Sequence, residues 1–395
     1  MTETSVDRYE DPHQRYSYRS TLIEQLRSGD GELNVGHVRV LTARTFGFCW
    51  GVDRAVAMVR DALKEHPGRC IWLLDQIIHN PQVNADFKEM GVRFLRGPFS
   101  EPELNGSPDQ SSVVVIPAFS ATVEDIRMLE GLECTVIDTT CPWVIRPHRR
   151  TLKYVEDQFT TVIHGLVQHE ETRASCSLIA SRGGHYLVVA DQVEAQRLCD
   201  VISGAMDRAG FLSGLAPNAR SEGFDPDKHL QRVGTINQTT MLASETREIE
   251  AMVRASLGER YGVDDVQERF RELNTICRAT QENQDSVAEM AERGPLDLLV
   301  VVGGYDSSNT KNLTRVGGGQ FPSYHVLGPE AIEGDTIKHR SPQTGEIVLT
   351  EGWLPKGPFT VGFTAGASTP DTLLGDTVRA VLDAADLPMG AVVGS

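Results

Sequence analysis

Residues 45–54 read Thr45-Phe-Gly-Phe-Cys49-Trp-Gly-Val-Asp-Arg54, and the rest of the chain can be interpreted outward from them. A β-rich run at residues 37–41 precedes this stretch, and the apolar spacing that follows it predicts a helix over residues 52–65. Cys49 is therefore expected in a strand-to-helix turn, with a glycine on either side. Because glycine has no Cβ, it allows a backbone to approach a bulky ligand closely. The stretch indicates a thiol at a ligand-binding turn.

Two further cysteines have comparable surroundings. Cys141 lies in Val136-Ile-Asp-Thr-Thr-Cys-Pro-Trp143, and Cys277 lies in Asn274-Thr-Ile-Cys-Arg-Ala-Thr280. Three thiolates can hold three corners of a cubane iron–sulfur cluster and leave the fourth iron open to a substrate oxygen. A free cysteine is more often a small buried apolar residue. That structural interpretation is given to the four cysteines that lie in or beside apolar runs: Cys70, Cys134, Cys176 and Cys199.

The composition is that of a globular and acidic chain. Its 395 residues are 40% hydrophobic and 24% charged, which predicts two or three domains. The net charge of −17 argues against binding of nucleic acid or of an anionic membrane. No apolar run approaches the roughly 18 residues of a membrane span, and the N-terminus resembles no targeting segment, so a cytoplasmic location is expected. The odd number of cysteines, seven, argues against a disulfide framework. The absence of a Cys-x-x-Cys pair argues against a zinc ribbon and a ferredoxin-like run.

Short β-rich runs alternate with helical patterns, which predicts an α/β fold. Several runs are continuously apolar, as is typical of parallel strands covered on both faces. The β-rich runs are 37–41, 70–74, 113–116, 134–137, 161–163, 186–189, 233–236, 298–302, 324–327 and 359–362. The helical segments include 52–65, 122–131, 143–157, 243–256, 281–293 and 370–385. Residues 204–231 and 329–358 break this rhythm and are interpreted as loop insertions.

Polar residues collect directly after many of these runs. Ligands of open parallel sheets bind outside the carboxyl ends of the strands. Short neutral donors and imidazoles suit a phosphate, and helix N-termini would add backbone donors. The alternative, that the serines and asparagines only cap helices, stays open. The residues at these strand ends include His79, His169, Glu171, Thr239, Ser307, Ser308, Asn309 and Ser368.

Together these residues resemble the 4-hydroxy-3-methylbut-2-enyl diphosphate reductase family, in its plant and cyanobacterial branch. Eight motifs occur in the family's order and span nearly the whole body of the chain. They are Gly47-Phe-Cys-Trp-Gly-Val-Asp-Arg-Ala55, Ile78-His-Asn-Pro81, Asp138-Thr-Thr-Cys-Pro142, His169-Glu-Glu171, Gln238-Thr-Thr240, Ile276-Cys-Arg-Ala-Thr-Gln281, Val302-Gly-Gly-Tyr-Asp-Ser-Ser-Asn309 and Thr364-Ala-Gly-Ala-Ser368.

The resemblance implies three small parallel-sheet α/β domains in a pseudo-threefold arrangement around a central [4Fe–4S] cluster. Cys49, Cys141 and Cys277 would hold that cluster. The expected division is an N-terminal extension over 1–36 and domains over 37–140, 141–275 and 276–395. The extension either packs on the body through its tyrosines or is partly disordered; these tyrosines are Tyr9, Tyr16 and Tyr18.

The resemblance also implies roles for the strand-end residues. Thr239 matches a threonine near the substrate hydroxyl, and Glu171 matches the proton donor. The diphosphate cradle would consist of His79, His169, Ser307, Ser308, Asn309 and Ser368. The family often has a further phosphate-side histidine, but here the corresponding loop is Ala118-Phe-Ser120. Either Ser120 donates instead or that contact is absent. Tyr305-Asp306 replaces a common Lys-Asn pair.

The implied reaction is reductive dehydroxylation of 4-hydroxy-3-methylbut-2-enyl diphosphate, a small allylic diphosphate. It gives isopentenyl and dimethylallyl diphosphates, with the substrate hydroxyl bound at the open iron, as the last step of the methylerythritol phosphate route to isoprenoids. An electron donor such as ferredoxin or flavodoxin is expected. The basic run Arg146-Pro-His-Arg149-Arg150 predicts where it docks, against the alternative of a solvated helix face. Alternative functions are an iron–sulfur hydro-lyase and a non-enzymatic, metal-holding structural or sensor protein.

Overall fold

The computed structural model describes residues 17–387 and confirms the predicted α/β class. Its strands form one sheet of eight strands and two sheets of four. Contacts divide the chain into two compact units, which are described separately. Unit 1 comprises Met1–Trp50, His79–Met90 and Glu282–Ser395, and unit 2 comprises Gly51–Ile78 and Gly91–Gln281. None of the helices within residues 17–387 is both long and apolar enough to cross a membrane.

Unit 2 contains both four-stranded sheets, and each is parallel throughout. The first sheet has the order β4-β3-β5-β6, formed by β3 (Ile71–Leu73), β4 (Arg93–Phe94), β5 (Val113–Ile116) and β6 (Thr135–Asp138). The second has the order β10-β9-β7-β8, formed by β7 (Thr160–His164), β8 (Tyr186–Val189), β9 (Val233–Asn237) and β10 (Phe270–Arg271).

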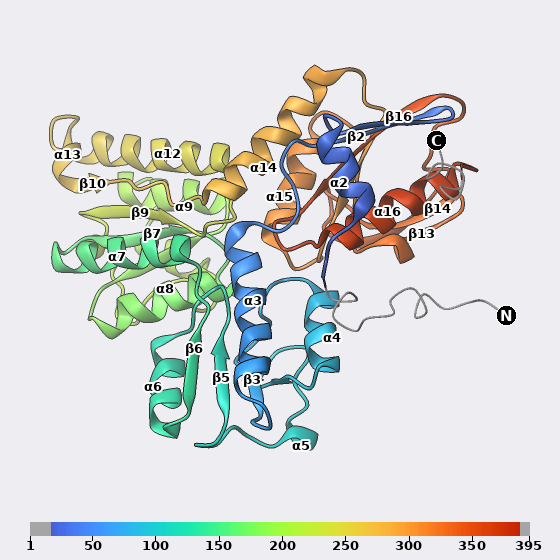
Figure 1. Ribbon diagram of the computed structural model, residues 1–395. Helices are drawn as coiled ribbons and strands as arrows, with labels where there is room; N and C mark the ends of the chain where they lie inside the picture. Colours follow the sequence, from blue (N-terminus) through green and yellow to red (C-terminus); the bar gives the residue numbers. More distant parts are fainter. Residues whose placement is uncertain (1–16, 388–395) are drawn as a thin grey trace. The chain divides into compact units, whose positions relative to one another are not determined.

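The helices of unit 2 connect these strands in chain order (Figure 1). They begin with α3 (Trp50–Glu65), whose first residue belongs to unit 1. They continue with α5 (Pro102–Asn105), α6 (Val123–Leu132), α7 (Pro142–Glu156), α8 (Glu170–Ser181), α9 (Gln192–Ser203), α10 (Arg208–Ser213), α11 (Pro226–His229), α12 (Ala243–Tyr261) and α13 (Val266–Arg269).

Unit 1 contains the eight-stranded sheet, which has a parallel part, β2-β16-β11-β12, and antiparallel additions. Its strands are β1 (Glu32–Val35), β2 (Val38–Thr42), β11 (Leu298–Val302), β12 (Ser323–Val326), β13 (Ile332–Glu333), β14 (Thr336–Arg340), β15 (Ile347–Glu351) and β16 (Phe359–Ala365). Its helices are α2 (Thr21–Ser28), α4 (Pro81–Glu89), α15 (Ser308–Gly318), α16 (Asp371–Ala384) and two 3-10 turns (Glu289–Arg293 and Pro329–Ala331), while α14 (Arg278–Ala288) begins in unit 2 and ends in unit 1.

The same strand order occurs three times. We number the four strands of each sheet by their order in the chain. In both four-stranded sheets the second strand is at one edge, followed by the first, third and fourth: β4-β3-β5-β6 and β8-β7-β9-β10. The parallel part of the third sheet repeats this order as β12-β11-β16-β2, with the N-terminal β2 in the fourth place beside β16 (Figure 1). Ligands of such sheets bind where the strand order reverses, between the first and third strands. Each repeat therefore has its own switch point.

Central strands are buried on both faces, as their apolar runs predict. All five residues of β11 and all seven of β16 are buried, and β5, β7 and β9 are equally enclosed. A parallel sheet covered by helices on both faces selects such continuous Val- and Ile-rich runs. This burial makes the strands rigid supports for the loops at their carboxyl ends.

The structure differs from the sequence-based expectation in three places. Residues 329–358, expected to be a loop insertion, form β13, β14 and β15, which extend the sheet of unit 1 antiparallel. Residues 204–231 contain the short helices α10 and α11. β2 pairs with β16 although the expected domain 37–140 separates the two.

The described part of the N-terminal extension is ordered on unit 1. Residues 17–36 contain α2 and β1. Tyr18 is buried, its hydroxyl donates to Asp86 at 2.8 Å, and its ring meets that of Phe48 edge-on. Tyr9 and Tyr16 lie outside the described residues.

Candidate active site

The three predicted metal-ligating cysteines occupy equivalent places in the repeated strand order. Each follows the strand in the fourth place, β2, β6 or β10, and each directly precedes a helix: Cys49 before α3, Cys141 before α7 and Cys277 before α14. The backbone N–H of each donates to a carbonyl in the loop after the third-place strand of its own sheet. The acceptors are Ala367 at 3.2 Å, Ala118 at 3.0 Å and Thr239 at 3.1 Å, respectively.

These positions suit thiolate ligands. A helix N-terminus carries unsatisfied N–H groups and a positive partial charge, so it stabilises a thiolate and an anionic cluster. Around Cys277 Sγ, the Thr280 N–H donates at 3.4 Å and the Thr280 hydroxyl lies 3.1 Å away. All three cysteines are half-buried. Each therefore has the residue type and the helix-start position that an iron–sulfur ligand needs.

The remaining cysteines differ from these three. Cys176 and Cys199 are buried, and burial raises the pKa of the Cys176 thiol to about 12, which keeps it protonated and inert. Cys134 is half-buried and lies against a hydrophobic cluster of unit 2. Cys70 is exposed, so it is not the core residue that its apolar neighbours in sequence suggested.

Unit 1 brings together three loops that carry predicted diphosphate-binding residues. The Ser368 hydroxyl donates to the carbonyl of His79 at 3.2 Å, and the Ala367 N–H donates to Oδ1 of Asn309 at 2.9 Å. A Cβ on Gly304 would lie only 2.4 Å from the His79 carbonyl oxygen, so only glycine allows these two loops to approach so closely. His79, Asn309 and Ser368 are all buried, and they are neighbours although they lie far apart in the sequence.

Two adjacent serines at the start of α15 have different roles. Ser307 caps the helix, because its hydroxyl accepts from the Thr310 N–H at 3.3 Å. This confirms the capping alternative for Ser307. The buried Ser308 hydroxyl has no hydrogen-bond partner among residues 17–387. A buried hydroxyl without a partner is costly, and a bound anion would satisfy it.

Two cationic side chains, Arg340 and Lys311, lie near the loop that contains Ser307. Arg340 Nη1 donates to the carbonyl of Tyr305 at 3.0 Å, and Tyr305 lies two residues before Ser307. Lys311 is in the first turns of α15, where burial and the nearby Arg340 charge lower its pKa. Arg340 comes from β14, so the strands of residues 329–358 add positive potential to the loop.

Unit 2 contains the predicted acid. Glu171 lies in the first turn of α8 and is 2% exposed. Its Oε1 accepts from the Thr239 N–H at 2.8 Å, and its Oε2 lies 2.9 Å from the Thr239 hydroxyl. Burial raises the pKa of Glu171 to about 7, and the two bonds from Thr239 oppose this rise without cancelling it. The carboxyl is thus poised to exchange a proton near neutral pH.

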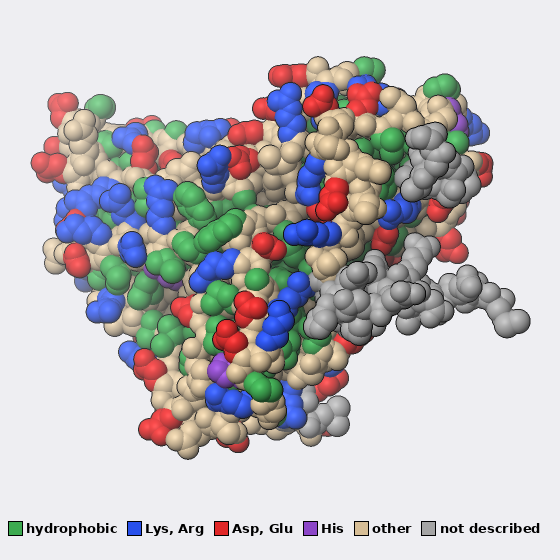
Figure 2. Space-filling view, viewed as in Figure 1, with side chains coloured by type: hydrophobic (Ala, Val, Ile, Leu, Met, Phe, Trp, Pro, Cys, Tyr) green, Lys and Arg blue, Asp and Glu red, His purple; other side chains and the backbone are tan. Residues whose placement is uncertain are grey.

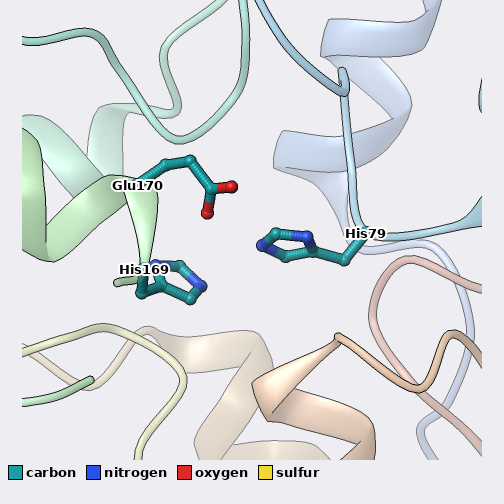
Figure 3. Close-up of side chains that lie close together, drawn as sticks. All are labelled: His79, His169 and Glu170. Carbon is teal, nitrogen blue, oxygen red and sulfur yellow. The ribbon is translucent and has the colours of Figure 1, made fainter. Parts of the chain in front are cut away.

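His169 caps the same helix. Its Nδ1 accepts from the Glu171 N–H at 3.3 Å, which assigns the proton of the neutral ring to Nε2. The ring of Phe119 meets this imidazole edge-on at 5.6 Å between centroids. Figure 3 shows the side chains of His169 and Glu170 extending to the same side from the first turn of α8, and His79 in the loop that precedes α4. His169 therefore presents an N–H donor in a fixed orientation.

The acid and the histidine adjoin the loops that hold the two cysteines of unit 2. The Thr239 carbonyl accepts from Cys277, and the Ala118 carbonyl, next to Phe119, accepts from Cys141. Sequence reasoning named Ser120 in this loop, but Phe119 makes the contact with His169, and Ser120 adopts a positive φ of 78°. Nothing local in the sequence distinguishes Phe119 as a partner of a residue fifty positions away.

Gln238 connects two loops of unit 2, a role that was not predicted from the sequence. Its Oε1 accepts from the Leu166 N–H at 3.0 Å, and its Nε2 donates to the Thr240 hydroxyl at 2.8 Å. It thereby joins the loop after β7, which leads to His169, to the loop after β9. The sequence signal for this role is that Gln238 belongs to the Gln238-Thr-Thr240 motif.

Every predicted site residue lies in a loop or helix start after a first-, third- or fourth-place strand, and none follows a second-place strand. The molecule is thus an α/β enzyme in which one four-stranded parallel arrangement occurs three times, once inside the eight-stranded sheet, with a thiol at an equivalent helix N-terminus in each repeat. Residues 40–382 match the family of LytB proteins, and the chain belongs to this family.

The chain is similar over most of its length to cyanobacterial proteins. It is 42% identical to the 4-hydroxy-3-methylbut-2-enyl diphosphate reductase of Synechococcus sp. (strain RCC307) over 94% of this chain and 90% of that one. It is also 42% identical to the enzyme of the same name from Synechocystis sp. (strain ATCC 27184 / PCC 6803 / Kazusa), over 92% of this chain and 95% of that one. These relatives agree with the predicted cyanobacterial branch.

Two solved structures share the fold. One is a reductase from Plasmodium falciparum that acts on E-1-hydroxy-2-methyl-but-2-enyl-4-diphosphate, with a TM-score of 0.62, 18% identity and 87% of each chain covered. The other is an (E)-4-hydroxy-3-methyl-but-2-enyl diphosphate reductase described as the terminal enzyme of the non-mevalonate pathway. It has a TM-score of 0.53 and 23% identity, and it covers 87% of this chain and 99% of that one.

Proposed function

We propose that this protein reduces 4-hydroxy-3-methylbut-2-enyl diphosphate to isopentenyl and dimethylallyl diphosphates in the cytoplasm. The reaction consumes two electrons and two protons, breaks the allylic C–O bond and releases water. The observation that carries the proposal is the equivalent placement of Cys49, Cys141 and Cys277 before three helices. Membership of the LytB family supports the choice of substrate.

The three cysteines would hold a [4Fe–4S] cluster. When bound, such a cluster offers one iron without a thiolate to the substrate hydroxyl and supplies electrons one at a time. The helix N-termini of α3, α7 and α14 supply the N–H groups and partial positive charge that favour thiolates over thiols. The half-buried position of each sulfur supports this role.

The diphosphate would bind mainly to neutral donors. His79, Ser308, Asn309 and Ser368 are buried together in unit 1, with Ser307 completing the start of α15. Backbone N–H groups of a helix N-terminus and hydroxyls bind phosphate oxygens well, because the helix dipole adds to the hydrogen bonds. His169 of unit 2 would add an N–H donor at Nε2, because its Nδ1 accepts the Glu171 N–H.

Glu171 would supply the proton for the departing hydroxyl. In the protonated form, its Oε2–H donates to the Thr239 hydroxyl 2.9 Å away, and that hydroxyl can donate its own proton onward to the leaving oxygen. Thr239 thus acts as a relay beside the substrate hydroxyl. The negative charge of a bound diphosphate raises the pKa of Glu171 further and keeps it protonated until it is needed.

The protein would receive its electrons from a small carrier such as ferredoxin or flavodoxin. We also propose that residues 1–36 form an extension and that domains over 37–140, 141–275 and 276–395 correspond to the three sheets. β2 is the exception, because its pairing with β16 joins the start of the first domain to the last sheet.

Anaerobic purification followed by Mössbauer spectroscopy and a reductant-driven assay tests the proposal. We expect about four irons per chain, consumption of two reducing equivalents per diphosphate and formation of both products. Loss of water from the substrate without consumption of reductant would indicate an iron–sulfur hydro-lyase. A bound metal with no turnover would indicate a structural or sensor protein.

A further inference from the structure

α7 carries a basic groove in an otherwise acidic molecule. The groove has a volume of about 420 Å³, and none of its lining residues is acidic. The lining residues are Pro142, Ile145, Arg146, Arg149, Arg150, Lys153 and Leu273. The chain as a whole has a net charge of −17, so this grouping of cations stands out locally. Figure 2 shows Lys and Arg side chains gathered in the region of α7, β10 and α13.

Three of the four cations of the groove make no ion pair with the described part of the chain. Arg146 and Arg149 are exposed and make no ion pair within residues 17–387. Arg150 lies over the ring of Tyr154 at 5.8 Å, which orients it without cancelling its charge. Lys153 differs, because it pairs with Asp157 at 3.0 Å and with Glu156 at 3.5 Å. The unpaired positive charge therefore lies at residues 146–150, in the middle part of the helix.

The basic surface continues beyond the groove. Arg232 and Arg271 both lie 4.2 Å from the centre of the Phe159 ring, which holds their guanidinium groups in place. They line a second hollow of about 440 Å³ together with Arg269, Gln267 and Glu268. Arg271 also pairs with Asp157, so this second region is partly neutralised. The extended surface is large enough to meet a macromolecule rather than a single ion.

The groove begins beside a cluster-ligand position. Its first lining residue, Pro142, directly follows Cys141, and Leu273 lies four residues before Cys277. At 1.5 Å rise per residue, Arg149 lies about 12 Å along the helix axis from Cys141. A partner on this groove would touch the chain segments that lead to both cysteines of unit 2.

An exposed tryptophan adds an apolar contact to this surface. Trp143 is 39% exposed, and Arg146 and Arg150 follow it by three and seven residues, which places all three on one face of α7. Tryptophan and arginine are the residues most enriched among energetically dominant interface contacts. The face therefore combines steering charge with an anchoring side chain.

We propose that this face of α7 is the docking site of an acidic one-electron carrier protein. The inference deepens the proposed function and rests on it, since a reductase needs such a partner. Complementary charge would speed encounter, and the negative charge elsewhere on the molecule would disfavour other orientations. An anionic nucleic acid would fit the same charge, but the net charge of the whole chain opposes its extended binding.

The test measures binding and turnover with a plant-type [2Fe–2S] ferredoxin as the probe. Binding of the oxidised ferredoxin to the full-length holoenzyme is followed by calorimetry at low and high salt. We expect the double variant Arg146→Glu/Arg149→Glu to bind about ten- to a hundredfold more weakly at low salt and to lose its salt dependence. Its turnover with dithionite as a small chemical reductant should equal that of the wild type.

The matched control is Lys338→Glu/Lys356→Glu, which makes the same charge change at two exposed lysines of unit 1. This control should bind ferredoxin as the wild type does. Equal loss in both double variants, unchanged binding in the α7 variant, or tighter binding of a short DNA duplex than of ferredoxin would overturn the docking site. Failure of the wild type to turn over with dithionite would instead refute the proposed function, whatever the binding result.

Discussion

The predicted site residues of the two units differ in kind. Unit 1 buries an imidazole, an amide and hydroxyl groups at the ends of loops, namely His79, Ser308, Asn309 and Ser368, with Lys311 and Arg340 near one of these loops. Unit 2 buries Glu171, a carboxyl whose pKa is raised by the same exclusion of water. Burial strengthens hydrogen bonds in both units, and in unit 2 it also raises the pKa of the predicted acid Glu171 to about 7. The difference indicates binding by unit 1 and proton transfer by unit 2.

The cysteines should be the exception to this division, because the repeated strand order gives them equivalent positions in both units. We predict that Cys49→Ser, Cys141→Ser and Cys277→Ser each abolish the cluster and all turnover. Iron and sulfide analysis with electron paramagnetic resonance checks this. Cys199→Ser, at a buried cysteine in the core of unit 2, is the control and should alter stability at most. A ligand variant that kept its cluster and activity would contradict the equivalence.

Glu171→Gln should give the next largest effect. Gln keeps the shape and accepts the Thr239 N–H, but it has no transferable proton, so kcat should fall by about 10²–10⁴-fold. Substrate binding and cluster content should be retained, as titration and Mössbauer spectra can show. Glu170→Gln, at the half-buried neighbour, is the matched control and should cost little. An equal loss in both variants would mean that the acid lies elsewhere.

Ser308 and Ser307 offer a sharper test of the binding role of unit 1. Ser308→Ala removes a buried hydroxyl that has no hydrogen-bond partner within residues 17–387, so it should weaken substrate binding about ten- to a hundredfold and leave the free energy of unfolding nearly unchanged. Ser307→Ala removes a helix cap and should lower the free energy of unfolding by about 1 kcal/mol. Substrate titration and chemical denaturation separate the two. The reverse pattern would exchange the roles of the two serines.

A further effect, graded with pH, concerns the ionisation of Glu171. Because the pKa of Glu171 is about 7, kcat/KM should be full below pH 6 and should fall about tenfold per pH unit above the pKa. The Glu171→Gln variant should lack this limb of the profile. A wild-type profile that is flat between pH 6 and 9 would show that no acid with this pKa limits the reaction.

The same ionisation affects stability with a definite sign. The folded pKa of about 7 lies above the ordinary glutamate value of 4.5, so between these pH values the folded protein keeps a proton that the unfolded chain has lost. The stabilising contribution of the protonated group is complete below pH 4.5 and is lost as the pH rises through 7. Relative to Glu171→Gln, the wild type should lose about 3 kcal/mol between pH 5 and 9. Denaturation at several pH values measures this difference.

Much of the fold could be predicted from local pattern. All ten β-rich runs became strands, because a strand buried on both faces needs a continuous apolar run of its own. The two-residue strands β4 and β10 were missed, since two residues carry no periodicity. β13–β15 were missed because their exposed residues alternate with glycine- and proline-rich turns. α8 was not among the predicted helices, although it carries Glu171.

The sequence by itself determined which side chains are available at the strand ends. The motifs around Cys49, His169 and Ser307 are contiguous, and the rule that parallel sheets bind ligands at their carboxyl ends needs only the strand assignments. The residue types also limit the chemistry: thiols for metal, short donors for phosphate and a carboxyl for proton transfer. Each of these properties belongs to a short segment of the chain, so it can be predicted without knowing which other residues that segment contacts.

Only the tertiary structure decided which of these residues meet. Glu171 and Thr239 are separated by 68 positions, and their two hydrogen bonds depend on β7 and β9 being neighbours. The pKa of Glu171, the tautomer of His169 and the free hydroxyl of Ser308 likewise depend on burial and on partners that no local pattern encodes. The physical reason is that solvent exclusion and hydrogen-bond partners are properties of the folded surroundings, whereas apolar periodicity is a property of the chain.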